Sequence, residues 1–476
     1  MILIFSLLII VSMISTKLSS KMGMPLLIGF ILVGIIAGSD VLNLLYFDNA
    51  LMTKQITDIL LIFIIFEGGF RVTRKNFHKT AGPSLTLATL GVMLTALALG
   101  LFIYFVLKLD FLTSFLIASI ISSTDAAAVF MVTKENPINP KLATTINVES
   151  AANDPMAILL TVTFIQLLTE GIKSPVTIVI SLTWQFLGGV AIGYLVHIVT
   201  IFVFNKFNSD NRGNYNVLII GQILFCYGLA VLCKANGIIA VFFMGYWLGN
   251  ANYAAKQGVS NFLESIASMC NVGLFLILGL LSFPSRFIYI WKEGVIVVLV
   301  LIFIARPIAV FLCTIPFKYN FKEKLFIIWG GIKGAVPIVL ATYPAAYGLD
   351  ENGYIFDIIF FAVFISCLLQ GSTLGLLSKA FNFTIPKRQT TPYVVELHST
   401  QETDVEMFEI HIDDDAQSIN TKISKLDLGQ DVLISSIIRD GKIVLPKGNV
   451  CIKAQDILFI LTSTEKIDEI NAILNN

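Results

Sequence analysis

Two groups of oxygen-bearing side chains interrupt otherwise apolar stretches of this 476-residue chain. In one group, Ser150 and Asp154 are four residues apart and share one face of a helix. Glu149 and Asn153, also four apart, lie on the neighbouring stripe, and the other group is the run Ser122–Asp125. Carboxylates at membrane depth are costly, so each indicates a function. Oxygen atoms bind hard cations and a carboxylate also binds a proton, so we expect a shared cation and proton site centred on Asp154.

The composition is that of a membrane protein that crosses the bilayer many times. Hydrophobic residues make up 56% of the chain, charged residues make up 13%, and the mean hydropathy is +0.83, which is outside the range of soluble domains. One crossing takes about 20 apolar residues. We therefore expect thirteen helical spans, near residues 2–17, 24–39, 56–70, 82–107, 111–132, 141–168, 176–205, 214–232, 236–250, 260–282, 288–316, 322–347 and 354–379.

Lys and Arg are unevenly distributed between alternate loops. Most of them follow the odd-numbered spans, and the opposite loops hold only Lys54, Lys108, Lys173, Lys234, Arg286 and Lys292. Because basic loops are retained in the cytoplasm, we expect the N-terminus outside the cell membrane and the C-terminus in the cytoplasm. No basic segment precedes the first span, so we expect a retained helix rather than a signal peptide.

The fifth and twelfth spans contain interruptions. The polar run Ser122–Asp125 surrounds its helix axis, and Gly330–Pro337 contains three glycines, a proline and the lone cation Lys333. Interruptions at matching places in spans 1 to 6 and 8 to 13 indicate a transporter with inverted repeats. Thr124 would offer an oxygen, Asp125 would balance helix N-terminal dipoles, and Lys333 would balance C-terminal carbonyls. Alternatively, the polar run packs against neighbouring helices and Lys333 reaches a membrane interface.

Arg306, which is followed by Pro307 in the eleventh span, needs a carboxylate partner because a lone guanidinium in the membrane is very costly. Glu149 is the partner that we expect. If that pair stays ionised, only Asp154 is left to exchange ligands. One cation would then be traded for one proton without net movement of charge.

The composition changes from about Thr390, where we expect a small soluble α+β domain. Asp440-Gly441 is a two-residue hairpin signal. The expected domains are a transmembrane unit at 1–380, a linker at 381–392 and a cytoplasmic domain at 393–476. Short strands are expected at Val394–Leu397, Met407–Ile412, Val432–Ile438, Ile443–Leu445 and Asp456–Leu461, followed by a helix at Thr464–Leu474.

Taken together, these motifs resemble those of the monovalent cation:proton antiporters, in particular the NhaP-type potassium/proton antiporters. The resemblance rests on Thr124-Asp125, Glu149 to Pro155, Ala305-Arg306-Pro307 and Gly330–Pro337. It implies a homodimer in a lipid membrane, with a dimerisation domain and a six-helix core that moves to give alternating access. It also implies that Asn-Asp, in place of Asp-Asp, accompanies electroneutral exchange.

The resemblance further implies roles for single residues. Asp154 would carry the cation and the proton, and Glu149 and Arg306 would form a structural ion pair. Lys333 departs from the motif, which usually has Arg there; Lys keeps the charge but loses the planar fork and can release its proton when buried. No cofactor and no metal beyond the transported ion are expected. Four residues would surround the site: Thr124, Asp125, Ser150 and Asn153.

The end of the chain resembles the TrkA-C regulatory domain of potassium-conductance regulators, which dimerises and in some members binds a small nucleotide ligand such as a cyclic dinucleotide. It favours K⁺ over Na⁺ by association. No GxGxxG follows a strand there, so a companion nucleotide-binding domain is not expected, and neither is a nucleic-acid partner. The alternatives are a sodium/proton antiporter of the same fold and a gated cation channel with a regulatory tail. An intramembrane aspartyl protease would have no use for Asn153 or Lys333, so a transporter is expected rather than an enzyme.

Overall fold

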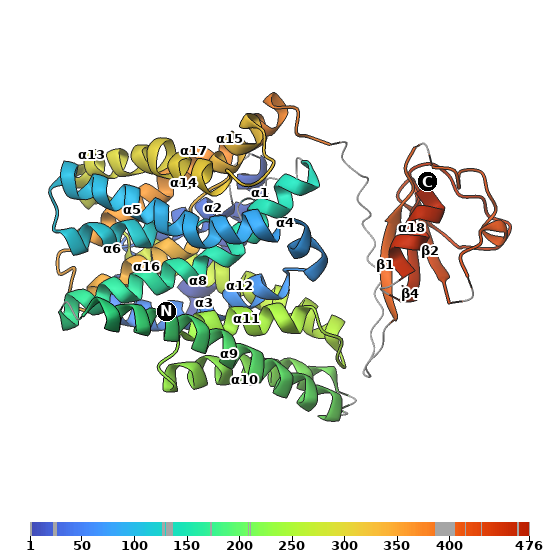
Figure 1. The fold of residues 1–476 in the computed structure, drawn as a ribbon, viewed down its shortest axis with the longest axis horizontal. Helices are drawn as coiled ribbons and strands as arrows, with labels where there is room; N and C mark the ends of the chain where they lie inside the picture. Colours follow the sequence, from blue (N-terminus) through green and yellow to red (C-terminus); the bar gives the residue numbers. More distant parts are fainter. Residues whose placement is uncertain are drawn as a thin grey trace. The chain divides into compact units, whose positions relative to one another are not determined.

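Helices form at each of the apolar stretches (Figure 1), because backbone polar groups in lipid must be satisfied within the segment. The structure is a computed structural model, and it describes residues 2–21, 26–125, 129, 137–171, 174–207, 209, 211–385, 405–414, 416–429, 431–463 and 466–475. Within these ranges, seven helices are long and apolar enough to cross a membrane without interruption. Within the described residues, every expected span overlaps a helix or a pair of helices, so the prediction of an all-α polytopic unit is confirmed. Residues 126–128 and 130–132 of the fifth expected span lie outside the described residues.

The membrane unit has the following helices: α1 (Ile2–Lys21), α2 (Leu26–Ala37), α3 (Ala50–Phe70), α4 (Arg74–Thr86), α5 (Val92–Phe102), α6 (Phe111–Ile121), α8 (Pro140–Glu170), α9 (Pro175–Phe207), α10 (Arg212–Leu232), α11 (Gly237–Gly249), α12 (Lys256–Leu281), α13 (Pro284–Val300), α14 (Arg306–Cys313), α15 (Phe321–Trp329), α16 (Ala335–Ala346) and α17 (Tyr354–Ala380). Single π-helical turns join α4 to α5 and α13 to α14, and a third extends α5 to Leu107.

Three helices that carry or support the polar groups start at capped positions. The Asp110 carboxylate accepts a hydrogen bond from Leu112 N at the start of α6, and the Asn139 side chain accepts one from Lys141 N at the start of α8. At the start of α15, Asn320 and Glu323 form a reciprocal capping box. These caps satisfy first-turn N–H groups that have no partner within the helix.

Glycines allow some helices to approach very closely. A Cβ added at Gly69 of α3 would collide with the carbonyl oxygen of Phe242 on α11. A Cβ added at Gly245 of α11 would collide in the same way with the carbonyl oxygen of Phe66. Such small-residue contacts are the usual means of close helix association in membranes, and here they hold α3 and α11 together.

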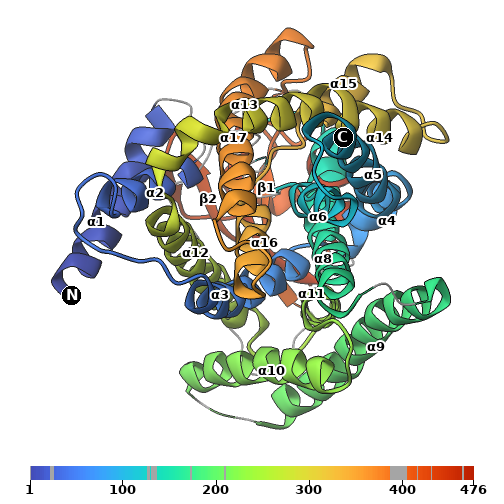
Figure 2. The ribbon, with the colours of Figure 1, turned by 90° about the vertical axis from the view of Figure 1, so that its left-hand side faces the viewer.

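The two interrupted spans meet each other inside the membrane unit. Residues 122–125 follow α6 without helical structure, and residues 330–334 separate α15 from α16. The Asp125 N–H donates a hydrogen bond of 2.8 Å to Ile332 O, so the interruptions are in direct contact. In Figure 2, α16 and α17 lie between a group formed by α1, α2 and α12 and a group formed by α4, α5 and α6. The prediction of crossing broken helices is confirmed.

The chain that follows α17 is held against the segment that precedes α8. Asn139 N donates to Phe383 O at 3.1 Å, Ile385 N donates to Pro137 O at 2.8 Å, and Ile138 forms an antiparallel bridge with Thr384. Residues 383–385, which were expected in the linker, therefore pair with the segment that leads into the helix that carries Asp154. Residues 386–404, including the expected strand Val394–Leu397, lie outside the described residues.

The described part of the tail is a four-stranded antiparallel sheet with one helix. The strands β1 (Val405–His411), β2 (Leu433–Arg439), β3 (Lys442–Val444) and β4 (Ile457–Ser463) are ordered β1-β4-β2-β3, and α18 (Ile467–Asn475) follows them. Asp440 and Gly441 form the β2–β3 turn with φ angles of 50° and 72°, as a two-residue hairpin requires. The tail core contains Ile410, Ile434, Ile437, Leu458, Ile460, Ile470 and Leu474. The predicted small α+β domain is confirmed.

A partly buried ion pair ties the tail sheet to the loop before β4. Arg439 donates from Nε and Nη2 to the two carboxylate oxygens of Asp456, each at 2.8 Å, and also from Nη2 to Cys451 O at 2.7 Å. Asp456 is fully buried and also accepts from Lys453 N. Hydrogen bonding to Asp456 raises the pKa of Arg439, so the guanidinium stays charged. This network fixes the end of β2 against the start of β4.

Candidate functional site

Helix α8 presents four polar side chains with different degrees of burial. Glu149 and Asn153 are completely buried and Ser150 is 1% exposed, whereas Asp154 keeps partial exposure. The Asp154 carboxylate lies within electrostatic reach of Asp125 and of Lys333. Of the two carboxylates in this group, Asp154 is therefore the one that has charged neighbours and is also partly exposed.

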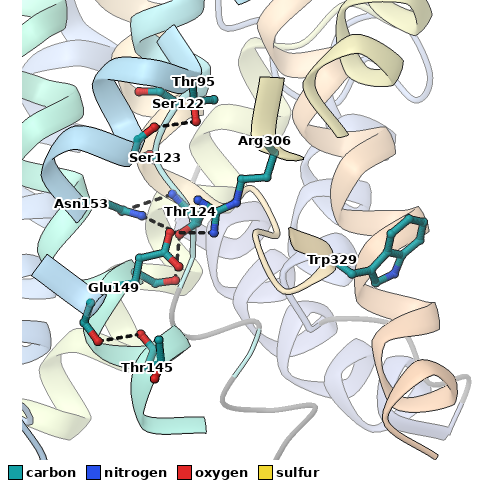
Figure 3. Close-up of polar contacts among 12 residues, drawn as sticks. Thr95, Ser122, Ser123, Thr124, Thr145, Glu149, Asn153, Arg306 and Trp329 are labelled. Carbon is teal, nitrogen blue, oxygen red and sulfur yellow. Dashed lines mark hydrogen bonds and ion pairs between the residues drawn. The ribbon is translucent and has the colours of Figure 1, made fainter. Parts of the chain in front are cut away.

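Thr124 is held to α8 by two side chains. Asn153 Nδ2 donates to Thr124 Oγ1 at 2.6 Å, and Thr124 N donates to Asn153 Oδ1 at 3.3 Å (Figure 3). The Thr124 and Ser150 hydroxyls are 2.8 Å apart and share a hydrogen bond. An ionised Asp at position 153 could accept but not donate, so the amide of Asn153 is what allows this two-way contact. The non-helical segment after α6 is thereby fixed to α8.

Asp125 lies at the N-terminal end of α16. Its carboxylate is so close to Gly334, the residue that precedes α16, that a Cβ at Gly334 would overlap it. The first N–H groups of a helix lack partners within the helix, and its N-terminus carries a partial positive charge. A carboxylate at this place stabilises the start of the second half-helix.

Lys333 lies at the opposite kind of helix end. Its ammonium donates to Ser122 O at 3.0 Å and to Ser123 O at 2.8 Å, and the residue is 1% exposed. These carbonyls follow the last turn of α6, where a helix carries partial negative charge. Lys333 therefore does not extend to a membrane interface; its charge is held at the first interruption.

Arg306 and Glu149 form an ion pair between α14 and α8. Arg306 Nη2 is 2.7 Å from Glu149 Oε1, and the two side chains are 4% and 0% exposed (Figure 3). The guanidinium also lies against Gly331: a Cβ there would be 2.6 Å from Arg306 Nε. The pair thus joins α8 to the second interruption.

The charges at the two interruptions do not cancel when all of them are ionised. Asp125, Glu149 and Asp154 contribute three negative charges. Arg306 and Lys333 contribute two positive charges. One net negative charge remains in a largely buried site, where an uncompensated charge is costly. One monovalent cation or one proton would neutralise it.

The structure also contains polar contacts that sequence analysis did not select. Tyr343 of α16 donates to Asp58 Oδ1 of α3 at 2.6 Å, and Lys54 Nζ donates to Asp58 Oδ2 at 2.7 Å. Gln370 of α17 donates to Trp329 O at the end of α15. The spacing of Lys54 and Asp58, four residues apart on one helix face, was a signal for the contact between these two residues, but not for the contact with Tyr343. A polar residue within the apolar stretch 354–379 was the only signal for the contact between Gln370 and Trp329.

Gly334→Ala tests the close approach of Asp125 to the second half-helix. We expect it to destabilise the membrane unit by about 1–3 kcal/mol, because the new methyl group overpacks a buried site. The measurement is the thermal unfolding midpoint of the purified protein in detergent. Gly228→Ala is the matched control, because a Cβ at Gly228 meets no atom within 4 Å. Equal midpoints for the two variants would contradict the contact.

The comparisons with known proteins cover both parts of the chain. The family described as "Sodium/hydrogen exchanger, transmembrane" matches residues 5–380, and the TrkA-C domain matches residues 407–475. The K(+)/H(+) antiporter NhaP2 of Shewanella sp. (strain ANA-3) is 31% identical over 478 residues, covering 99% of this chain and 83% of that protein. The K(+)/H(+) antiporter NhaP of Alkalimonas amylolytica is 30% identical over 476 residues, with the same coverage.

A sodium proton antiporter of known structure has a similar fold. MjNhaP1 from Methanocaldococcus jannaschii, in its structure at pH 8, superposes with a TM-score of 0.68 at 25% sequence identity. The likeness covers 79% of this chain and 97% of MjNhaP1. It therefore extends over nearly all of that protein.

Proposed function

This chain belongs to the sodium/hydrogen exchanger family, and we propose that it exchanges K⁺ for H⁺ across the cell membrane at Asp154. The protein is a cation/proton antiporter and not an enzyme. The observation that supports the site most strongly is the single net negative charge around the two interruptions. Asp154 is the carboxylate of that group that is neither ion-paired to Arg306 nor seated at the start of α16.

The charge balance supports electroneutral exchange. A cation bound at Asp154 and a proton bound at Asp154 neutralise the site equally well, whereas both together leave one positive charge in it. The ion pair of Glu149 with Arg306 and the contacts of Lys333 with Ser122 and Ser123 keep the other charges in place. One cation is then exchanged for one proton, and the rate should not respond to an imposed membrane potential.

Two observations bear on the transported ion. The relatives named K(+)/H(+) antiporter align with 99% of this chain, and the tail matches the TrkA-C domain; both support K⁺. The second candidate is Na⁺, because the Na(+)/H(+) antiporter 1 of Methanocaldococcus jannaschii is 27% identical over 393 residues. The oxygen ligands do not distinguish the two ions, since both are hard cations.

We also propose that the protein is a homodimer. Its N-terminus would lie outside the cell and its tail in the cytoplasm, where the tail would respond to a small nucleotide ligand such as a cyclic dinucleotide. The distribution of basic loops supports this orientation. Alternating access would move α16 relative to α3. The hydrogen bond between Tyr343 and Asp58 joins these helices and would have to open in the other conformation.

The function is tested in proteoliposomes that contain a pH-sensitive dye and carry an imposed proton gradient. We expect K⁺ to dissipate the gradient more strongly than Na⁺, and Asp154→Asn to abolish the effect. Asp48→Asn makes the same chemical change at an exposed loop position and should leave exchange intact. A stronger response to Na⁺ would favour the sodium antiporter. If neither ion dissipates the gradient in vesicles that contain folded protein, the antiport mechanism is wrong and a channel is favoured.

A further inference from the structure

The carbonyl groups at the end of α15 need partners from outside the helix. The last four carbonyls of a helix have no intrahelical donor, and α15 ends at Trp329 inside the membrane unit (Figure 3). Gly330 N and Gly331 N satisfy Phe326 O and Ile328 O. Trp329 O accepts instead from Gln370 Nε2 of α17 at 3.1 Å.

The Gln370 amide has a hydrogen-bond partner at each end, and one of them sets its orientation. Gln370 is 1% exposed, and its Oε1 accepts from the Ser366 hydroxyl at 2.6 Å. Trp329 O can only accept, so the amide must present its NH₂ group to it. Reversing the amide would place two acceptors against each other. Trp329 O therefore sets the donating orientation of Gln370, and Ser366, one turn earlier on α17, satisfies the remaining amide oxygen.

Thr373 makes a second contact with the same residue of α15. Trp329 Nε1 donates to Thr373 Oγ1 at 2.8 Å, and Thr373 lies three residues after Gln370 on the same helix. α17 thus binds Trp329 through both its backbone carbonyl and its indole ring. Two contacts fix the position and the direction of the end of α15.

We propose that Gln370 is a positioning residue for the ion site and that Thr373 assists it. Trp329 is followed directly by residues 330–334, where Ile332 O meets Asp125 N and Lys333 reaches the carbonyls after α6. Only three residues lie between Trp329 and Lys333, so the place where the chain leaves α15 determines where the ammonium can lie. Gln370 does not touch the ion; it acts through this segment.

The chemistry of Gln suits this position because it is neutral. A Lys or Arg at position 370 would also satisfy Trp329 O, but it would add a positive charge at the end of α15, directly before the second interruption. The net negative charge at the interruptions would then vanish, and with it the demand for a cation. A neutral donor caps the carbonyl and leaves the charge balance unchanged. This part of the inference rests on the proposed exchange at Asp154.

Gln370→Met is the decisive variant, because Met has a similar length and shape but no donor. We expect the half-saturating K⁺ concentration to rise by about ten-fold, which corresponds to the loss of one buried hydrogen bond, while the maximal rate changes less. Ser366→Ala should have a smaller effect in the same direction. Ser378→Ala is the control, because Ser378 is 2% exposed on α17 and, among the described residues, its hydroxyl donates within its own helix, to Gly375 O.

Hydrogen exchange measured by mass spectrometry supplies a readout that does not depend on transport. Gln370→Met should speed the exchange of backbone amides in residues 330–334, and Ser378→Ala should not. If Gln370→Met does not fold, Thr373→Val reports on the second contact by the same two measurements. Unchanged exchange in residues 330–334, or an unchanged half-saturating concentration in an active protein, would overturn the positioning role. A parent protein that fails to transport would refute the proposed function instead, and the hydrogen exchange result would still decide the positioning role.

Discussion

Arg306→Met should destabilise the membrane unit by about 3–5 kcal/mol, because it leaves a buried carboxylate without its counter-charge. Glu149 is completely buried, and apart from the ion contact its oxygens have no hydrogen-bond partner among the described residues. Glu149→Gln should destabilise the protein for the reciprocal reason. The measurement is thermal unfolding of the purified protein in detergent. The readout is the loss of the monodisperse peak in size-exclusion chromatography after heating.

The double variant Glu149→Gln/Arg306→Met separates a pairing effect from a packing effect. Replacing both members of a buried pair is often neutral or even stabilising, so the double variant should unfold at a higher temperature than either single variant. It also removes one negative and one positive charge, so the site keeps its single net negative charge. We therefore expect it to retain measurable exchange, whereas each single variant changes that net charge. A double variant that is no more stable than the worse single variant would rule out the pairing argument.

The residues that sequence alone identified share one physical property. Glu149, Asp154, Arg306 and Lys333 are charged groups in apolar segments, where the cost of burial leaves few explanations other than a partner or a function. The hairpin at Asp440-Gly441 was equally predictable, because only a few residue pairs adopt positive φ at two successive positions. In both cases the local chemistry restricts the structure strongly.

The contacts that could not be predicted from the sequence join neutral groups or residues that are far apart along the chain. Gln370 and Trp329 are 41 residues apart, and Tyr343 and Asp58 are 285 apart. A neutral polar residue on an apolar helix has many acceptable surroundings, so its type does not specify its partner. The pairing of residues 383–385 with 137–139 was hidden for the same reason, since it uses backbone groups that every residue possesses.

Lys333→Met should abolish cation and proton exchange. It removes the donor for Ser122 O and Ser123 O and leaves those buried carbonyls unsatisfied, at a cost of about 1–3 kcal/mol. It also raises the net negative charge at the interruptions from one to two, so that a single bound proton or cation no longer neutralises the site. The proteoliposome assay measures the loss, and detergent unfolding reports how much of it is structural.

Lys333→Arg is the matched control, because it keeps the charge. A guanidinium can still donate to the Ser122 and Ser123 carbonyls, and it does not lose its proton in proteins. We expect this variant to exchange K⁺ for H⁺ at neutral pH. If the Lys333 ammonium releases its proton at alkaline pH, the Arg variant should also keep its activity to higher pH than the parent. Loss of exchange in Lys333→Arg, in protein that unfolds like the parent, would contradict charge compensation and require a role for the shape of the ammonium itself.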